Sequence, residues 1–251
     1  MNITILCGSS NSSYARDVLR AINERGLGRI NVVAAVNSGP PRTVKSLWAK
    51  YGWTLPWAML RSAASRLVSG VTALLPHDPK GSLEEEVRAE GGRLILVQDL
   101  NGEACRWAVE AMQVDLMILA GTPIIRAPIL KVPKLGTLNA HQGALPAYRG
   151  MNVIEWAILE GASPAVSIHF VDPGVDTGDI VIAEKIPIVE GDTFASIRFR
   201  AGRQQCEMLA RAARQALSGP LTRRPQRAEE GRQFYSMHPR LKAIAEIHLP
   251  A

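Results

Sequence analysis

The chain has 251 residues, of which 47% are hydrophobic and 21% are charged, a composition typical of a soluble globular protein with room for a buried core. Its three cysteines are far apart and show no paired spacing, which argues against a zinc site or a disulfide framework and favours a reducing cytoplasm. The first residues lack a basic leader and no stretch approaches the roughly 18 apolar residues of a membrane span, so we expect a cytoplasmic protein without membrane association.

The formal net charge of +6 is concentrated in two segments. Residues 41–80 contain six basic residues and one acidic residue, and residues 222–242 contain six basic and two acidic residues. The rest of the chain is not basic. This distribution favours local contacts with anionic groups over a nucleic-acid-binding body, and we expect no nucleic-acid partner.

The chain begins with an apolar run at residues 3–7, a loop of small polar residues, and a helical pattern that stops near Gly26. A strand that leads through such a loop into a helix presents free backbone N–H groups, which favour an anion. Ser9, Ser10 and Asn11 are therefore candidate anion-binding residues. The loop is neither a dinucleotide-binding nor a Walker motif. The alternative is a plain turn in which a serine caps the helix.

A second strand is expected at residues 30–36, and the next segment is rich in tryptophan. From Trp53 to Leu74, apolar residues recur every three or four positions, which predicts one amphipathic helix in an insertion at about 41–80. We expect this helix to pack on the core of its own domain. The alternatives are a lid over the substrate, a contact with a second copy in a homodimer, or a membrane-surface helix.

The remaining predicted elements alternate between strands and helices. Helices are expected at 83–90, 102–112, 151–160 and 193–217, and strands at 93–97, 116–120, 136–141, 165–171 and 180–188. This order predicts an α/β fold, a Rossmann-like, doubly wound and mostly parallel sheet. We expect one domain over residues 1–220, because Gly219 and Pro220 end the last helix, and a short basic C-terminal extension over residues 221–251.

Two short stretches carry candidate catalytic side chains. Asn139 and His141 are two positions apart near the end of a predicted strand, so their side chains should point to the same face. A Pro/Gly turn after the strand at 165–171 carries Asp172, Asp176 and Asp179. If the two strands are neighbours, a carboxylate can meet the imidazole at the edge of the sheet where ligands bind.

The motifs around these residues resemble those of the folate-dependent formyltransferases. They are Asn139-x-His141, the run Leu-Pro-x-Tyr-Arg-Gly at 145–150, and Gly-x-Asp-Thr-Gly at 174–178. The family includes glycinamide ribonucleotide, methionyl-tRNA and sugar-nucleotide N-formyltransferases. The similarity is dense from about Leu116 to Asp192 and thin before that. It implies the formyltransferase fold, with residues 1–220 as the catalytic domain.

The resemblance also implies a mechanism. The co-substrate would be N10-formyltetrahydrofolate, and the catalytic residues would be Asn139, His141 and Asp176. Asn139 would polarise the formyl oxygen, and His141 would stabilise the oxyanion and move a proton. Asp176 would pair with His141, raise its pKa and take up the amine proton. The chemistry needs no metal, and no metal-binding set is expected.

Binding residues follow from the same resemblance. The pterin of the folate is expected to contact the loops after two strands, at Ile124, Ile125, Arg126, Asp172, Pro173, Gly174 and Val175. The acceptor is expected to contact Ser9, Ser10, Asn11, Gln142, Gly143 and Tyr148. Gln142 and Gly143 stand where the family commonly has a Pro-Ser or similar pair, which favours an unusual acceptor. His169 is expected to be structural, and the alternative is that it helps to hold the Asp176 loop.

The expected activity is N-formylation of a small metabolite, such as an amino sugar-nucleotide or another phosphorylated amine. Methionyl-tRNA formyltransferases continue into a further β domain that helps to bind tRNA, whereas only about 30 residues follow position 220 here. A methionyl-tRNA formyltransferase-like protein without that domain is one alternative. A formyltetrahydrofolate hydrolase, in which water replaces the amine, is another. A non-catalytic folate- or nucleotide-binding domain is the non-enzymatic alternative.

Overall fold

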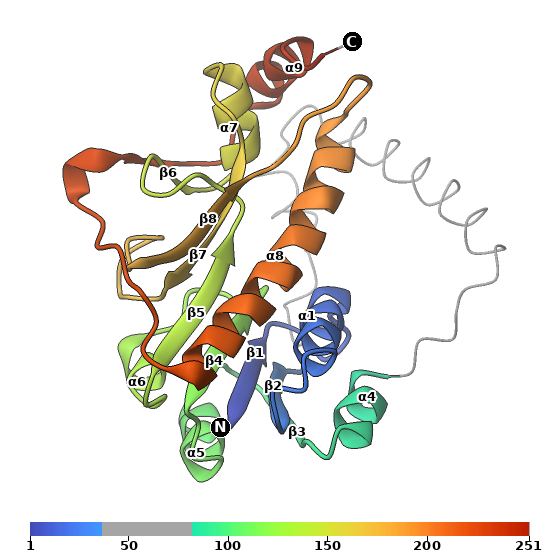
Figure 1. Cartoon of the computed structure of the whole chain (residues 1–251), viewed down its shortest axis with the longest axis vertical. Helices are drawn as coiled ribbons and strands as arrows, with labels where there is room; N and C mark the ends of the chain where they lie inside the picture. Colours follow the sequence, from blue (N-terminus) through green and yellow to red (C-terminus); the bar gives the residue numbers. More distant parts are fainter. Residues whose placement is uncertain (37–81, 251) are drawn as a thin grey trace, which may run out of the picture. The chain divides into compact units, whose positions relative to one another are not determined.

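A computed structural model of the chain describes residues 1–36 and 82–250. The insertion expected at about 41–80, with its predicted helix from Trp53 to Leu74, lies outside the described residues. The described part contains a seven-stranded sheet with helices on both faces, which confirms the predicted α/β fold (Figure 1). Within these residues, no helix is both long and apolar enough to span a membrane.

The sheet is mostly parallel, with the strand order β3-β2-β1-β4-β5-β7-β8. The strands from β3 to β5 pair in parallel, whereas β7 runs antiparallel to both β5 and β8. Their bounds agree with the predicted strands to within a few residues: β1 (Ile3–Cys7), β2 (Ile30–Ala35), β3 (Leu94–Val97), β4 (Leu116–Ala120), β5 (Gly136–His141), β7 (Ala165–Phe170) and β8 (Ile180–Lys185).

Helices cover the sheet on both faces (Figure 1). On one face lie α1 (Ser13–Asn23), α4 (Leu83–Ala89) and the long α8 (Phe194–Ser218), and on the other lie α5 (Glu103–Ala111) and α6 (Ala127–Leu130). The side chain of Thr193 caps the start of α8 by accepting a hydrogen bond from the Ser196 N–H. Leu138 and Ala140 of β5 belong to the core beneath α8. Because side chains alternate along a strand, Asn139 and His141 point to the opposite face.

The pairing of β4 with β5 stops before either strand ends. It runs from Leu116 opposite Gly136 to Ile118 opposite Leu138, while β5 continues to His141 paired with β7 alone. β4 meanwhile continues to Ala120 in register with β1. The two strands therefore separate at their carboxyl ends, which is where open α/β sheets bind ligands.

The C-terminal segment folds back onto the body and contains elements that the sequence pattern did not indicate. Strand β9 (Arg232–Phe234) pairs in parallel with β6 (Tyr148–Gly150). Helix α9 (Pro239–Ile247) packs against α7 (Val153–Leu159), and a short 3-10 helix spans Ala228–Glu230. The Phe234 ring packs against Tyr148 and Trp156, with its centroid 5.2 and 5.3 Å from theirs. These aromatic contacts fix the segment against the domain.

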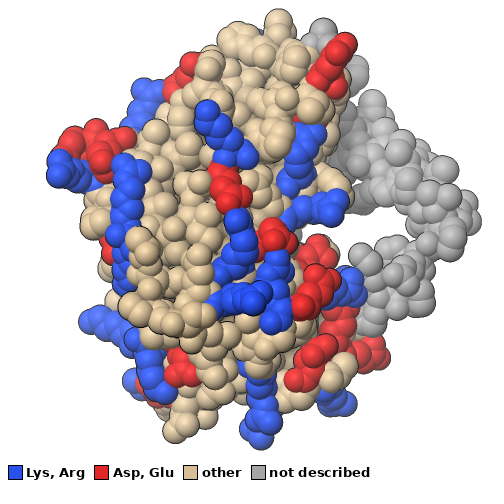
Figure 2. All heavy atoms as spheres, in the orientation of Figure 1, with Lys and Arg blue, Asp and Glu red and all other residues tan. Residues whose placement is uncertain are grey.

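Acidic partners neutralise many of the basic residues in this C-terminal segment. Ion pairs join Arg224 to Glu230, Arg232 to Glu160 and Lys242 to Glu155. Figure 2 shows that acidic and basic side chains are interspersed on the face in view. The local excess of basic residues in the sequence therefore does not give a surface of one sign on that face.

Candidate active site

The structure brings Asn139 and His141 of β5 together with Asp176, as the sequence predicted, and adds His169 of β7. The Nδ1 atom of His141 lies 3.4 Å from Asp176 Oδ2, and Nε2 of His169 lies 3.5 Å from Asp176 Oδ1. Nδ2 of Asn139 lies 3.2 Å from His169 Nε2. One carboxylate therefore sits between two imidazoles, beside an amide.

Backbone carbonyls fix the tautomers of both histidines. Nε2 of His141 is 2.8 Å from the carbonyl of Tyr148, and Nδ1 of His169 is 2.8 Å from the carbonyl of Phe170. A carbonyl can only accept, so each of these ring nitrogens carries the proton. In its neutral form His141 consequently presents the unprotonated Nδ1 to Asp176. The Nε2 atom of His169 accepts a hydrogen bond from the Asn139 amide.

Burial decides the protonation of His141. The side chain is 8% exposed, and its desolvation lowers the pKa below the usual 6.5, although the charge of Asp176 and the Tyr148 carbonyl act in the opposite direction. The expected net rise in the His141 pKa was therefore wrong, because burial outweighs the carboxylate. Burial raises the pKa of Asp176, but His169 and His141 in their protonated forms and the Gly150 N–H lower it by more, so it stays below the usual 3.8.

The loop that carries Asp176 is held in an unusual conformation. Asp176 has a φ of 53°, in the left-handed region that Asp tolerates better than most residues. The Gly150 N–H donates a 2.9 Å hydrogen bond to its Oδ2. From the C-terminal segment, Gln226 Nε2 donates to the carbonyls of Asp176 at 3.0 Å and Gly178 at 2.6 Å. Both the side chain and the main chain of Asp176 are thereby fixed.

Arg149, part of the motif after His141, supports this arrangement indirectly. Its buried side chain donates to Gln226 Oε1 at 3.1 Å and to the Arg227 carbonyl at 2.9 Å. The guanidinium thus orients the amide that holds the Asp176 loop. Arg149 does not line the pocket described next.

A pocket of about 660 Å³ opens beside the four polar side chains, a size suited to a small-molecule ligand. Its walls come from the loops after β4 and β7, from β5, and from the C-terminal segment. The lining residues are Leu119, Thr122, Pro123, Ile124, Ile125, Asn139, His141, Gly150, Met151, His169, Val171, Asp172, Pro173, Gly174, Val175, Asp176, Gln233, Phe234 and Tyr235.

Most residues expected to contact the pterin line this pocket, and Arg126 does not. Ile124 is 78% exposed and Val175 is 37% exposed, so both present apolar surface to a ligand. Asn101 fixes the loop at Ile124, donating to its carbonyl at 3.0 Å and accepting from the Arg126 N–H at 2.7 Å. Asp172 Oδ1 accepts hydrogen bonds from the Gly174 N–H and the Thr177 hydroxyl, so this oxygen stabilises the turn that contains Asp172.

None of the residues expected to contact the acceptor lines the pocket. Gln142 points towards α8, and the Tyr148 hydroxyl donates to Glu160 at 2.9 Å. A Cβ on Gly143 would lie 2.5 Å from His141 Nε2, so this glycine lets the chain pass close to the ring. The loop that holds Ser9, Ser10 and Asn11 precedes α1, and the Ser12 hydroxyl caps that helix.

Sequence patterns missed several residues that line the pocket. His169 resembles an ordinary buried position on an alternating strand. Its role depends on the antiparallel register that places it directly opposite Asn139. Met151, Gln233 and Tyr235 carry no sequence signal, because their approach to the pocket depends on the pairing of β6 with β9.

Comparisons with known proteins identify a family for part of the chain. The sequence profile described as formyl transferase matches residues 96–213, which include all four clustered side chains. Residues 96–213 therefore belong to the formyl transferase family.

Curated methionyl-tRNA formyltransferases are among the proteins that this chain resembles. That of Delftia acidovorans is 38% identical over 128 residues, which cover 50% of this chain and 39% of the relative. That of Parvibaculum lavamentivorans is 30% identical over 154 residues, 61% of this chain and 49% of the relative. The match thus spans less than half the length of these relatives.

Solved formyltransferase structures share the fold. Glycinamide ribonucleotide transformylase 1 from Symbiobacterium toebii has a TM-score of 0.60 at 21% identity, covering 90% of this chain and 94% of that one. A sugar N-formyltransferase from a Shewanella species has a TM-score of 0.60 at 14% identity, covering 99% of this chain and 87% of that one. The formyltransferase PseJ from Anoxybacillus kamchatkensis, solved with a UDP-linked formamido sugar and tetrahydrofolate, has a TM-score of 0.50 at 24% identity over 61% of this chain and 79% of that one.

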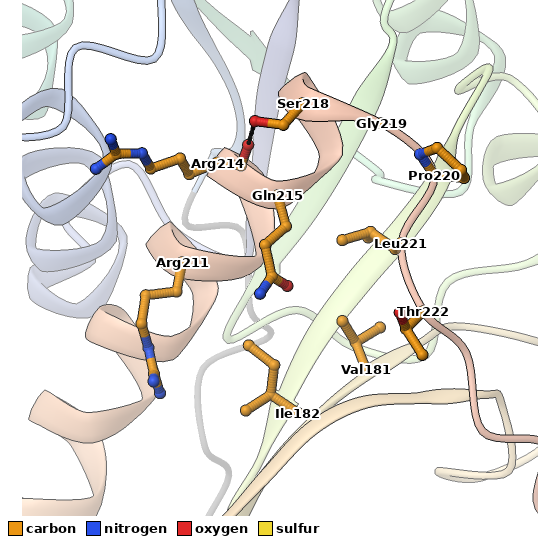
Figure 3. A pocket seen from close by; sticks show the side chains of 10 residues that line it. All are labelled: Val181, Ile182, Arg211, Arg214, Gln215, Ser218, Gly219, Pro220, Leu221 and Thr222. Carbon is orange, nitrogen blue, oxygen red and sulfur yellow. Dashed lines mark hydrogen bonds between the residues drawn. The ribbon is translucent and has the colours of Figure 1, made fainter.

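The described part of the chain has a second hollow, of about 710 Å³, between α8, β8 and the turn that follows α8 (Figure 3). It is lined by Val181, Ile182, Arg211, Arg214, Gln215, Ser218, Gly219, Pro220, Leu221 and Thr222. Arg211 is paired with Glu184 at 2.6 Å. No residue of the His/Asp cluster lines this hollow, so it is not the candidate active site. In residues 1–36 and 82–250, no three His, Cys, Asp or Glu side chains are grouped to hold a metal ion.

Proposed function

We propose that this protein is an N-formyltransferase that moves the formyl group of N10-formyltetrahydrofolate to the amine of a small metabolite, such as an amino sugar-nucleotide. The observation that carries the proposal is the Asp176 carboxylate held 3.4 and 3.5 Å from two imidazoles, beside the Asn139 amide. Acyl transfer to an amine needs a donor for the developing oxyanion and a group that moves protons near neutral pH. This cluster contains both.

The pocket fits the folate by its chemistry. Ile124, Ile125 and Val175 line the pocket and offer apolar surface for a flat ring. Backbone groups of residues 122–126 and 172–175 would supply hydrogen bonds to the edge of the ring. The bound folate would supply the activated formyl group.

Asn139 is proposed to stabilise the negative charge that develops on the formyl oxygen. One of its amide protons is engaged by His169 Nε2, which leaves the second to donate to the substrate. His169 would therefore orient the amide, and its own ring is locked by the Phe170 carbonyl. Loss of one such donor typically lowers the rate by about 10²- to 10³-fold.

His141 and Asp176 are proposed to handle the amine proton. The lowered pKa of His141 keeps it neutral at pH 7, with Nδ1 free to accept a proton. The charged Asp176 beside Nδ1 would then stabilise the imidazolium. His141 would return the proton from Nδ1 to the departing nitrogen, while Nε2–H remains bound to the Tyr148 carbonyl.

The acceptor is proposed to approach along the C-terminal segment. Tyr235 lines the pocket and is 69% exposed, whereas its main-chain carbonyl is held by a 2.9 Å hydrogen bond from Trp156 Nε1. A free ring on a fixed backbone suits stacking with a base or a sugar ring. A Tyr235→Ala variant should raise the KM for the acceptor and leave the KM for the folate unchanged, while Tyr235→Phe should retain most of the affinity.

Methionyl-tRNA is the second candidate acceptor, because the methionyl-tRNA formyltransferase of Delftia acidovorans is 38% identical to this chain over 128 residues. A tRNA would make many phosphate contacts, so its KM should rise steeply with salt concentration. The KM of a small acceptor with one or two phosphates should change much less over the same range.

A direct assay tests the proposal. The purified chain is mixed with N10-formyltetrahydrofolate and, in turn, a UDP-linked 4-amino sugar, glycinamide ribonucleotide or methionyl-tRNA, and tetrahydrofolate and formylated products are measured by mass spectrometry. We expect tetrahydrofolate to appear only when a small amine is present. Release without any amine would indicate a hydrolase. Binding without turnover, even after a wider search of amines, would indicate a folate-binding domain.

A further inference from the structure

A chain of polar side chains lies beneath β5, on the face opposite the pocket. The buried Gln205 of α8 donates from Nε2 to the carbonyl of Ala140 at 2.7 Å, and its Oε1 accepts from Gln142 Nε2 at 3.0 Å. Ala140 stands between Asn139 and His141, and Gln142 follows them directly. These two glutamines therefore hold the main chain on both sides of His141.

The position of Ala140 explains why its carbonyl needs a hydrogen-bond partner from a side chain. Strand β4 pairs with β5 only as far as Leu138, so the sheet does not supply a partner from β4 at Ala140. Gln205 provides the hydrogen bond at the point where the strands separate. A buried carbonyl without a partner would cost about 1–3 kcal/mol and would leave the end of the strand free to move.

This series of hydrogen-bonded side chains ends at a buried carboxylate, that of Glu155. Arg198 donates to Gln142 Oε1 at 3.1 Å and to Glu155 Oε2 at 2.5 Å. Glu155 is fully buried on α7, and Lys242 Nζ of α9 lies 3.1 Å from its other oxygen. Burial raises the pKa of Glu155, but the hydrogen bond and charge of Arg198 lower it by a larger amount. The carboxylate therefore stays charged and fixes Arg198.

We propose that Gln142 and Gln205 are positioning residues that hold Asn139 and His141 in reactive geometry, anchored through Arg198 to the buried Glu155. This inference rests on the function proposed above and concerns how the same site is held. A displacement of about 1 Å in a catalytic group can lower the rate about 100-fold. The alternative, that Gln142 binds the acceptor, conflicts with a side chain that points to α8 and does not line the pocket.

The first test replaces each glutamine by Met, which keeps the length of the side chain and removes both the donor and the acceptor. Gln142→Met and Gln205→Met are compared with Gln204→Met, a neighbour on α8 that contacts only the carbonyl of Lys185 among the polar contacts described. With N10-formyltetrahydrofolate and the UDP-linked 4-amino sugar, we expect kcat to fall about 10- to 100-fold. Both KM values should stay within about twofold, because neither residue touches a substrate.

The second test needs no substrate, so it separates this inference from the proposed function. NMR titration of the His141 ring is recorded for the free protein and for the variants. In Gln205→Met, the midpoint should rise towards 6.5, because a loosened strand admits water to the buried ring. Gln204→Met should match the wild type. A His141 midpoint in Gln205→Met that equals the wild-type midpoint would overturn the proposal, whatever the activity of the wild type proves to be.

Arg198→Lys provides a milder variant in case a glutamine variant does not fold. Lysine retains a positive charge near Glu155 but cannot bond both Glu155 and Gln142 in the forked geometry of Arg. We expect a partial loss of kcat and an intermediate His141 midpoint. A rise in the acceptor KM of Gln142→Met at unchanged kcat would show instead that Gln142 is an acceptor contact.

Discussion

Gln226 donates a hydrogen bond from Nε2 to the main-chain carbonyl of Asp176, at 3.0 Å. Fifty positions separate the two residues, and Gln226 lies beyond the region matched by the formyl transferase profile. A residue from the C-terminal segment therefore contacts the main chain of Asp176, which has a left-handed conformation. This segment both lines the pocket, through Gln233 and Tyr235, and holds a proposed catalytic loop.

A Gln226→Ala variant should lower kcat by about tenfold or more, because two carbonyls of the Asp176 loop lose their donor. The stability of the fold should fall by only about 1–3 kcal/mol. Steady-state kinetics and a urea titration measure the two effects. Gln215→Ala, at an exposed position on α8, is the matched control and should change neither. Unchanged kcat in Gln226→Ala would show that the loop holds its geometry without this residue.

An Asp176→Asn variant should lose about 10²- to 10⁴-fold in kcat/KM, the usual contribution of a positioned acid–base group. Asn tolerates the left-handed backbone and can still accept from the Gly150 N–H, so the fold should be retained. Circular dichroism checks the fold and initial rates check the activity. Asp172→Asn, whose carboxylate bonds within its own turn, should have a much smaller effect. Equal losses in both variants would argue against a specific role for Asp176.

Stability should fall as the pH drops below about 6.5. The pKa of folded His141 lies below its unfolded value of 6.5, so between the two values the unfolded state binds more protons and is favoured by acid. Asp176 has a lowered pKa as well, and its contribution is lost at lower pH, below its unfolded value of 3.8. Urea midpoints measured from pH 8 to pH 4 test this, and His141→Gln should flatten the upper part of the curve.

A Gly150→Ala variant should be both less stable and less active. Gly150 has a φ of 97°, and a Cβ there would lie 2.1 Å from the Phe234 carbonyl oxygen. The clash would part β6 from β9 and displace the N–H that binds Asp176, with an expected cost of more than about 1 kcal/mol. Gly202→Ala is the control, because nothing lies within 4 Å of its Cβ and Ala is favoured in α8 by up to about 1 kcal/mol. In thermal unfolding, the melting temperature should fall for Gly150→Ala and rise for Gly202→Ala.

The sequence predicted the elements whose signal is local. The strands and helices of the described body follow from apolar periodicity, and the spacing of Asn139 and His141 correctly placed both on one face. The same alternation places Gln142 on the other face, with Ala140. The expectation that Gln142 contacts the acceptor did not take this alternation into account. Strand alternation was the stronger physical signal at this position.

Features that depend on tertiary pairing could not be predicted from the sequence. The position of His169 opposite Asn139 depends on β7 entering the sheet antiparallel between two other strands. Strand β9 spans only Arg232–Phe234 and has no periodicity to detect. The direction of the His141 pKa also depended on burial, which the motif could not show. The predicted helix from Trp53 to Leu74 lies outside the described residues.

The Tyr148 carbonyl closes the Nε2 side of His141. A histidine that relays protons through its ring needs both nitrogens open, one to receive and one to release. In the proposed reaction only Nδ1 of this ring can exchange a proton. His141 would therefore accept one proton and release it from the same atom, and would not relay protons into the protein interior.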